Sequence, residues 1–189
     1  LLLPFYSGME GGHALARLLF GDVSPSGKLP FTMASDSQDL PPFEPFGEVA
    51  DYGDDHGYLR FDKQRLPVAF PFGYGLSYTR FAYDELKVDE VLVVEEGTLG
   101  VSVRVRNEGA RVGAEVVQLY VGFPNARVER PVKLLRGFRK VWLAAGEERE
   151  VRFDLPVSEL AYYAPETGRW TVEAVAHTVL VGGSSREDD

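Results

Sequence analysis

Four residues in the first third of the chain have side chains that could do chemistry: the carboxylates Asp51, Asp54 and Asp55 and the imidazole of His56. Paired carboxylates on either side of a sugar carry out glycoside hydrolysis. An acidic loop is also commonly just a solvated surface, and a catalytic carboxylate needs burial that a sequence does not show. The cluster matches no known spacing of metal ligands, so it does not predict a metal site. The sequence therefore leaves two roles open for the cluster, a catalytic site and a solvated surface loop.

The acidic cluster lies in a long segment, residues 34–66, which is predicted to lack regular structure because of three prolines between positions 41 and 45. The segment nevertheless carries aromatic residues that a solvated linker would not keep. Their rings could stack on the face of a sugar or hold the loop against its neighbours, since so long a connection is usually functional or packed. The sequence does not decide between these roles for Phe43, Phe46, Tyr52, Tyr58 and Phe61.

Other patterns narrow the kinds of site that the chain can hold. The glycines at positions 8, 11 and 12 lack the spacing of a phosphate-binding loop and indicate close packing at a helix start. The histidines are His13, His56 and His177, and no serine is paired with one of them and an acid. The chain has no cysteine, which excludes disulfides and cysteine-ligated zinc. We expect neither a metal nor a cofactor.

Composition limits the size and the partners of the protein. The 189 residues suffice for one medium domain, or for a small domain with a remnant of another. The net charge of −9 disfavours nucleic acid and anionic membrane as partners and suits a neutral ligand. No apolar run is long enough for a membrane helix. The chain starts with three leucines and no initiator methionine, so we expect it to be cut from a longer protein that holds the chemistry upstream.

The first part of the chain shows the pattern of half an α/β unit. Apolar residues at Ala14, Leu15, Leu18 and Leu19 predict a helix that ends near Gly21, and residues 28–33 are predicted to be extended. Residues 71–79 combine glycines with large aromatic side chains, so we expect a tight turn there, with Gly73 and Gly75 free to adopt positive φ. This turn separates the helical part from a region of short strands.

After residue 79 the apolar residues alternate, which predicts strands with one buried face. The strands and their turns follow one another regularly, as in an antiparallel β-sandwich. We expect Phe138 and Trp142 to fill the core of this sandwich or its edge. The predicted strands cover residues 81–88, 99–105, 115–123, 134–143, 148–155, 160–164, 169–174 and 178–181.

Several long motifs make the chain resemble the C-terminal part of family 3 glycoside hydrolases. Residues 10–14 and 19–32 are similar to the end of the family's second domain, and residues 52–63 to the loop that follows it in one branch. Residues 71–81 are similar to the segment that leads into the third domain. That third domain is fibronectin type III-like, and residues 117–121, 131–141 and 182–185 resemble it.

The resemblance implies a mainly β fold, in which a fibronectin type III-like sandwich is preceded by the C-terminal remnant of an α/β sandwich domain. It implies a domain remnant over residues 1–40, a long loop and linker over 41–80, and the sandwich over 81–189. The sequence departs from the family after the Trp-x-Val-Glu strand, where residues 174–177 stand in place of the usual Pro-Gly and aromatic residue. We therefore expect the hairpin that follows this strand to turn differently.

The resemblance also implies a function for the parent protein, an exo-acting β-glucosidase or β-xylosidase that retains configuration. Its nucleophilic Asp and acid/base Glu would lie upstream of Gly8, so no catalytic residue is assigned here and this chain would mainly brace the catalytic domains. The other possibility is a non-catalytic module that binds carbohydrate or protein.

The long loop is where we expect contact with a substrate. We predict that residues 41–66 border the leaving-group sugar of a small β-linked saccharide, and that Tyr52, Asp54, Asp55 and His56 bind it. The expected partners are therefore that saccharide and the catalytic barrel domain of the same protein.

Overall fold

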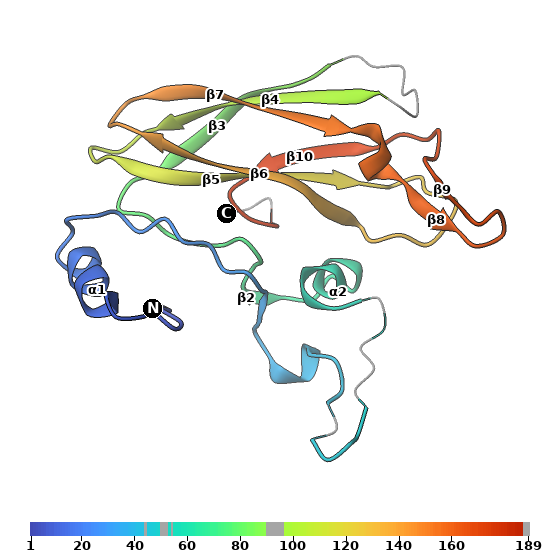
Figure 1. Cartoon of the computed structure of the whole chain (residues 1–189), viewed down its shortest axis with the longest axis horizontal. Helices are drawn as coiled ribbons and strands as arrows, with labels where there is room; N and C mark the ends of the chain where they lie inside the picture. Colours follow the sequence, from blue (N-terminus) through green and yellow to red (C-terminus); the bar gives the residue numbers. More distant parts are fainter. Residues whose placement is uncertain (44, 50–52, 54, 90–96, 187–189) are drawn as a thin grey trace.

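Most of the chain folds as a β-sandwich that rests on a long N-terminal arm (Figure 1). The computed structural model describes residues 1–43, 45–49, 53, 55–89 and 97–186. One sheet has the order β10–β5–β6 and the other the order β3–β4–β7, with antiparallel neighbours in both. The sandwich predicted from the sequence is confirmed. Its strands are β3 Phe81–Val88, β4 Thr98–Asn107, β5 Gly113–Gly122, β6 Lys133–Leu143, β7 Glu148–Pro156 and β10 Thr178–Gly182.

The core lies between the two sheets and is built from alternate residues of their strands. Val101, Val103 and Val105 of β4 pack with Val117 and Leu119 of β5, and all are at most 2% exposed. Each such side chain contributes about 1.5–3 kcal/mol through its burial. Since cysteine is absent, this apolar packing holds the two sheets together.

The N-terminal arm holds the remaining early elements and lies along one side of the sandwich, below it in Figure 1. It consists of α1 Gly11–Leu19, β1 Met33–Ala34, the 3-10 turn η1 Ser37–Asp39, α2 Gly57–Lys63 and β2 Val68–Phe70. Strand β1 pairs antiparallel with β2. The predicted helix is present, and Gly21 ends it with φ +79°. None of its residues is buried, and Leu19 of its apolar face is 64% exposed.

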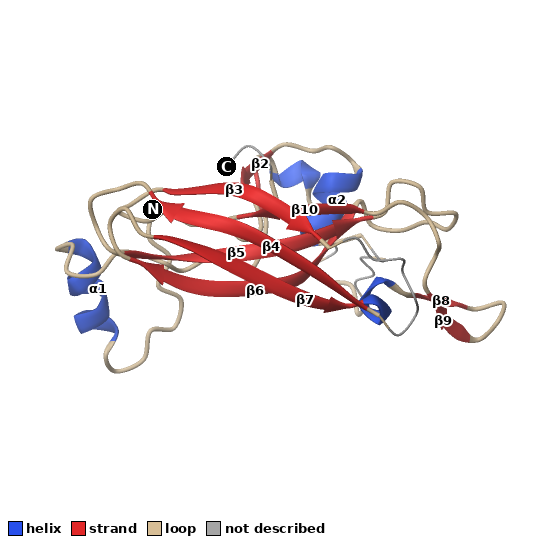
Figure 2. Ribbon diagram, turned by 90° about the horizontal axis from the view of Figure 1, so that it is seen from above, coloured by secondary structure: helices blue, strands red, loops and turns tan. Residues whose placement is uncertain are grey.

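Helix α2 was not predicted, because the prolines of the long segment suggested irregular structure throughout. The prolines end at position 45, and Gly57 begins the helix with φ +54°. Phe61, at 2% exposed, anchors the helix. Downstream, the turn η2 Val157–Leu160 leads to a separate hairpin of β8 Tyr162–Ala164 and β9 Arg169–Thr171, which projects from one end of the sandwich (Figure 2).

Of the two positions predicted for Phe138 and Trp142, the core of the sandwich or its edge, the core is wrong, since the side chains are 68% and 52% exposed. Both belong to β6, an edge strand of its sheet. Strand residues point alternately to opposite faces. A side chain at Gly137 would meet Phe153 in the core, and Leu143 is itself a core residue. Their neighbours Phe138 and Trp142 must therefore point outward.

No helix in the described part of the chain has both the length and the apolar character needed to cross a membrane.

Candidate functional site: the joint between the strap and the sandwich

The outer face of the β10–β5–β6 sheet is covered by residues 55–80, called here the strap, and the contacts between the two form the joint (Figure 1). As a result, β5 is buried on both faces. Two of the four residues predicted to bind a saccharide, Asp55 and His56, lie at the start of the strap. The other two, Tyr52 and Asp54, lie outside the described residues.

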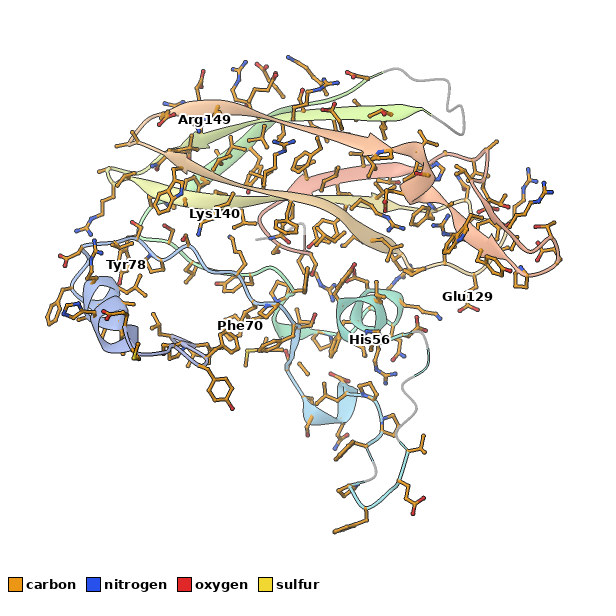
Figure 3. The ribbon with its side chains drawn as sticks, in the orientation of Figure 1. His56, Phe70, Tyr78, Glu129, Lys140 and Arg149 are labelled. Atoms are coloured by element: carbon orange, nitrogen blue, oxygen red, sulfur yellow. The ribbon has the colours of Figure 1, made fainter. Side chains whose placement is uncertain are left out.

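Asp55 is held by an ion pair with Lys63 at the end of α2, and Lys63 also contacts Glu129 Oε1 at 2.5 Å. The hydrogen bond that Lys63 donates to Asp55, and then the one it donates to Glu129, raise the pKa of Lys63. Glu129 comes from the loop between β5 and β6, so Lys63 links the predicted site to the sandwich. His56 occupies the N-cap position of α2, is exposed and forms no side-chain cap bond (Figure 3).

Two aromatic residues of the long segment take the packing role that the sequence left open. Phe61 is buried, and the Tyr58 ring lies 5.1 Å from the Phe72 ring. The Tyr58 hydroxyl accepts a hydrogen bond of 3.1 Å from the Leu135 backbone N–H, and burial is the main cause that raises its pKa. The side chains of Phe61 and Tyr58 therefore pack the strap onto the sandwich. In contrast, the side chains of Phe43 and Phe46 are 65% and 94% exposed.

A buried carboxylate lies between the strap and the sandwich. Asp62 of α2 has a side chain that is 5% exposed, and it lies between two cations. Lys133 Nζ of β6 is 3.4 Å from Asp62 Oδ2, and Arg186 Nη2 is 3.5 Å from Asp62 Oδ1. The same Arg186 nitrogen donates to the Leu66 carbonyl at 3.1 Å. A buried carboxylate is costly unless it is paired, so these cations hold α2 in place.

A second polar contact is centred on Gln118 of β5, which is 3% exposed. Its Nε2 donates to the Gly73 carbonyl at 3.2 Å and to the Gly183 carbonyl, while its Oε1 accepts from the Tyr120 hydroxyl at 2.6 Å. A Cβ at Gly73 would lie 2.2 Å from Gln118 Oε1, and the φ of Gly73 is +81°. Glycine is thus required there for both conformation and space. Burial raises the pKa of Tyr120.

A third contact joins the N-terminal arm to the sandwich. Lys28 Nζ lies 2.9 Å from Glu115 Oε1, and the same oxygen accepts from the Tyr83 hydroxyl at 3.1 Å. Lys28 Nζ also donates to the Gly75 carbonyl at 3.1 Å. The expectation of positive φ at Gly75 is wrong; glycine is needed because a Cβ would lie 2.1 Å from the Gly27 carbonyl oxygen. Burial, reinforced by Glu115, raises the pKa of Tyr83.

The arm is fixed at its far end by two further contacts, which Figure 3 shows on the side of the sheet toward α1. The Tyr78 hydroxyl donates to the Leu18 carbonyl at 2.6 Å, and Lys140 Nζ donates to the Ser26 hydroxyl at 2.8 Å. The strap is therefore bound to the sandwich near α2 and, through Tyr78, to α1.

These contacts position groups and do not assemble a reaction centre. Among the residues that the structure describes, no group of three or more His, Asp or Glu side chains could hold a metal ion. The sequence analysis missed Asp62, Gln118, Lys133 and Arg186 as functional residues. One signal was available: Gln118 is a polar residue within the run 116–121, which is otherwise apolar apart from the tyrosine hydroxyl. This pattern indicates that the outer face of the strand is covered.

Two family models match the chain. Residues 1–78 match the glycosyl hydrolase family 3 C-terminal domain, and residues 115–185 match the fibronectin type III-like domain. The joint therefore connects the segments that the two family models match. A beta-glucosidase of Kluyveromyces marxianus is 43% identical over 98% of this chain, and thermostable beta-glucosidase B of Acetivibrio thermocellus is 40% identical over 99% of it.

Solved structures show the same architecture. The beta-D-glucoside glucohydrolase of Trichoderma reesei is similar with a TM-score of 0.86 and 34% identity, covering 95% of this chain and 28% of that one. The beta-glucosidase 3B of Thermotoga neapolitana in complex with glucose has a TM-score of 0.82 and 39% identity, covering 94% of this chain and 25% of that one. The chain spans 22% and 25% of the length of the two sequence relatives named above.

Proposed function

This chain belongs to the C-terminal part of glycoside hydrolase family 3, and from that premise we propose that it is the bracing portion of a β-glucosidase. Relatives named beta-glucosidase match nearly the whole chain at about 40% identity, which supports an O-glycosidic substrate for the parent enzyme. The catalytic carboxylates belong, in this proposal, to upstream domains. We assign residues 1–40 to the end of an α/β sandwich domain, 41–80 to a linker and 81–189 to the fibronectin type III-like domain.

One observation carries the bracing role: the buried carboxylate of Asp62 between Lys133 and Arg186. The sandwich supplies both cations and the linker supplies the carboxylate. The ion pairs therefore form only when the two parts are packed against each other. Removing either cation would leave the buried carboxylate short of a partner, so the ion pairs favour the arrangement in which α2 lies against the sandwich. The sandwich thus holds the linker, and the linker in turn holds the loop that precedes α2.

That loop is our proposed wall of the saccharide site. Asp55 lies at its end beside Lys63, and His56 is exposed next to it. We include Tyr52 and Asp54 in the same wall because they adjoin these two residues in the sequence. Exposed Phe43 and Phe46 offer apolar ring faces to a sugar, and the polar groups offer hydrogen bonds to its hydroxyls.

The test compares two preparations. The purified 189-residue chain is expected not to hydrolyse an aryl β-glucoside, since both catalytic carboxylates would be elsewhere. In the full-length enzyme, Tyr52→Ala and the double change Asp54→Asn with Asp55→Asn should raise KM or alter leaving-group preference while the melting temperature is kept. Activity of the chain alone that one carboxylate substitution abolishes would contradict the proposal, as would variants that lose stability with KM unchanged.

A second function, carbohydrate binding outside the catalytic site, is favoured by the hairpin of β8 and β9. Tyr163 and Trp170 are cross-strand partners, 51% and 73% exposed, with ring centroids 5.7 Å apart. Adsorption of the chain to insoluble β-glucan tests this function. Loss of binding in Trp170→Ala but not in Trp142→Ala would support it, because Trp142 is also exposed but lies on β6 and not on this hairpin.

A further inference from the structure

The residues after β10, 183–186 and here called the tail, pass between the strap and the sheet. The Ser185 backbone N–H donates to the Phe72 carbonyl at 2.8 Å, and the Gly183 carbonyl accepts from Gln118. Ser184 and Ser185 are 6% and 2% exposed. The tail is therefore covered by its neighbours. Here it is tied to both the strap and β5.

The tail ends in Arg186, whose guanidinium reaches two points on α2 and its exit. It forms the ion pair with Asp62 and the hydrogen bond to the Leu66 carbonyl. Asp62 lies in the last turn of the helix, and Leu66 follows three residues after its end. Arg186 is therefore the side chain that joins the C-terminal end of α2 to the tail.

We infer that the tail is a clasp for α2, and that Arg186 is a positioning residue that holds the start of the strap against the sandwich. Without Arg186, Asp62 would keep one cation, Lys133, and the Leu66 carbonyl would lose this donor. Leaving a buried charge short of partners costs more than removing an exposed pair. The cost would fall on α2, because the core of the sandwich does not include it.

The consequence for the saccharide site rests on the proposed function. Lys63, one residue after Asp62, binds Asp55, and His56 occupies the N-cap position of the same helix. A shift of α2 would thus move both residues of the proposed wall together. Arg186 would influence substrate binding without touching a substrate.

Hydrogen exchange on this chain tests the clasp. Arg186→Ala should speed exchange of the α2 amides about tenfold while β4 and β5 keep their protection, as expected for local opening. Arg186→Lys should restore part of the protection, because its ammonium can still pair with Asp62. Arg149→Ala is the matched control, since Arg149 pairs with Glu147 on the other sheet, away from α2 (Figure 3). Unchanged α2 exchange in Arg186→Ala would overturn the inference.

Asp62→Asn supplies a second test through a double-mutant cycle. If Arg186 acts through Asp62, adding Arg186→Ala to Asp62→Asn should change α2 exchange less than it does in the wild type. If the effects of the two substitutions on α2 exchange are fully additive, Arg186 does not act through Asp62 and the inference is wrong.

Kinetics separate the inference from the proposed function. In the full-length enzyme, Arg186→Ala should raise KM severalfold with kcat within about twofold. Loosened α2 with unchanged KM would uphold the clasp and reject the saccharide wall at Asp55 and His56. Unaltered exchange would reject the clasp whatever the kinetics show.

Discussion

The two faces of the β10–β5–β6 sheet are both buried, but by different chemistry. The inner face presents Val117, Leu119 and Val121 to an apolar core. The outer face presents Gln118 and Tyr120 to the strap, where side chains meet main-chain oxygens and charges. Adjacent residues of one strand therefore take part in two kinds of interface.

The difference teaches how the two halves of the molecule are joined. Apolar burial is non-directional, so the core stabilises the sandwich roughly in proportion to the area it removes from water. Hydrogen bonds and ion pairs contribute less net free energy, but they are costly to leave unmade and hold one geometry. The core provides stability, and the joint provides the position of the strap.

Removing a core side chain should have the largest effect. Leu119→Ala is expected to lower the free energy of unfolding by about 2–5 kcal/mol, through lost burial and a residual cavity. Urea denaturation of the whole chain measures the change. Leu86→Ala is the control, since Leu86 is 45% exposed on β3. Equal losses in both variants would mean that the core is not where the stability lies.

Removing a polar contact of the joint should cost less. Gln118→Ala would leave the Gly73 and Gly183 carbonyls and the Tyr120 hydroxyl without this partner. We expect a loss of about 1–3 kcal/mol, the cost of unsatisfied buried polar groups. Proteolysis should also cut the strap sooner. A strap that stays protected in Gln118→Ala would show that the joint depends on other contacts.

Alkaline pH should lower the free energy of unfolding through the buried hydroxyl of Tyr83. The pKa of Tyr83 is raised in the folded state, mainly by burial, so the unfolded chain loses this proton first. The stabilisation is complete below the unfolded pKa of about 10 and is lost as pH rises above it. The urea midpoint should fall less steeply above pH 10 in Tyr83→Phe. Tyr163→Phe, at an exposed position, should retain the wild-type slope.

The smallest effect is expected on the exposed side of β6. Phe138→Ala and Trp142→Ala should each change the free energy of unfolding of this chain by no more than about 0.5 kcal/mol, as is usual for surface positions. A loss near the 3–5 kcal/mol typical of a buried aromatic would restore the original prediction that these rings fill the core.

The sequence by itself determined the sandwich and most of its strand limits. Alternation of apolar residues is a local signal, and it located β3 at Phe81–Val88 as predicted and β6 within one residue. The same signal could not say which face of β6 was covered, because both alternating sets contain apolar residues. Phe138 and Trp142 were therefore assigned to the wrong side.

Only the tertiary structure decided the joint. Asp62, Lys133 and Arg186 are far apart in the chain, and nothing local in the sequence shows that two cations meet one carboxylate. Helix α2 likewise depends on burying Phe61, which a pattern of prolines and polar residues does not reveal. The period of apolar residues along one strand indicates which side of that strand is buried. A polar contact between distant segments, in contrast, exists only once the fold has brought the segments together.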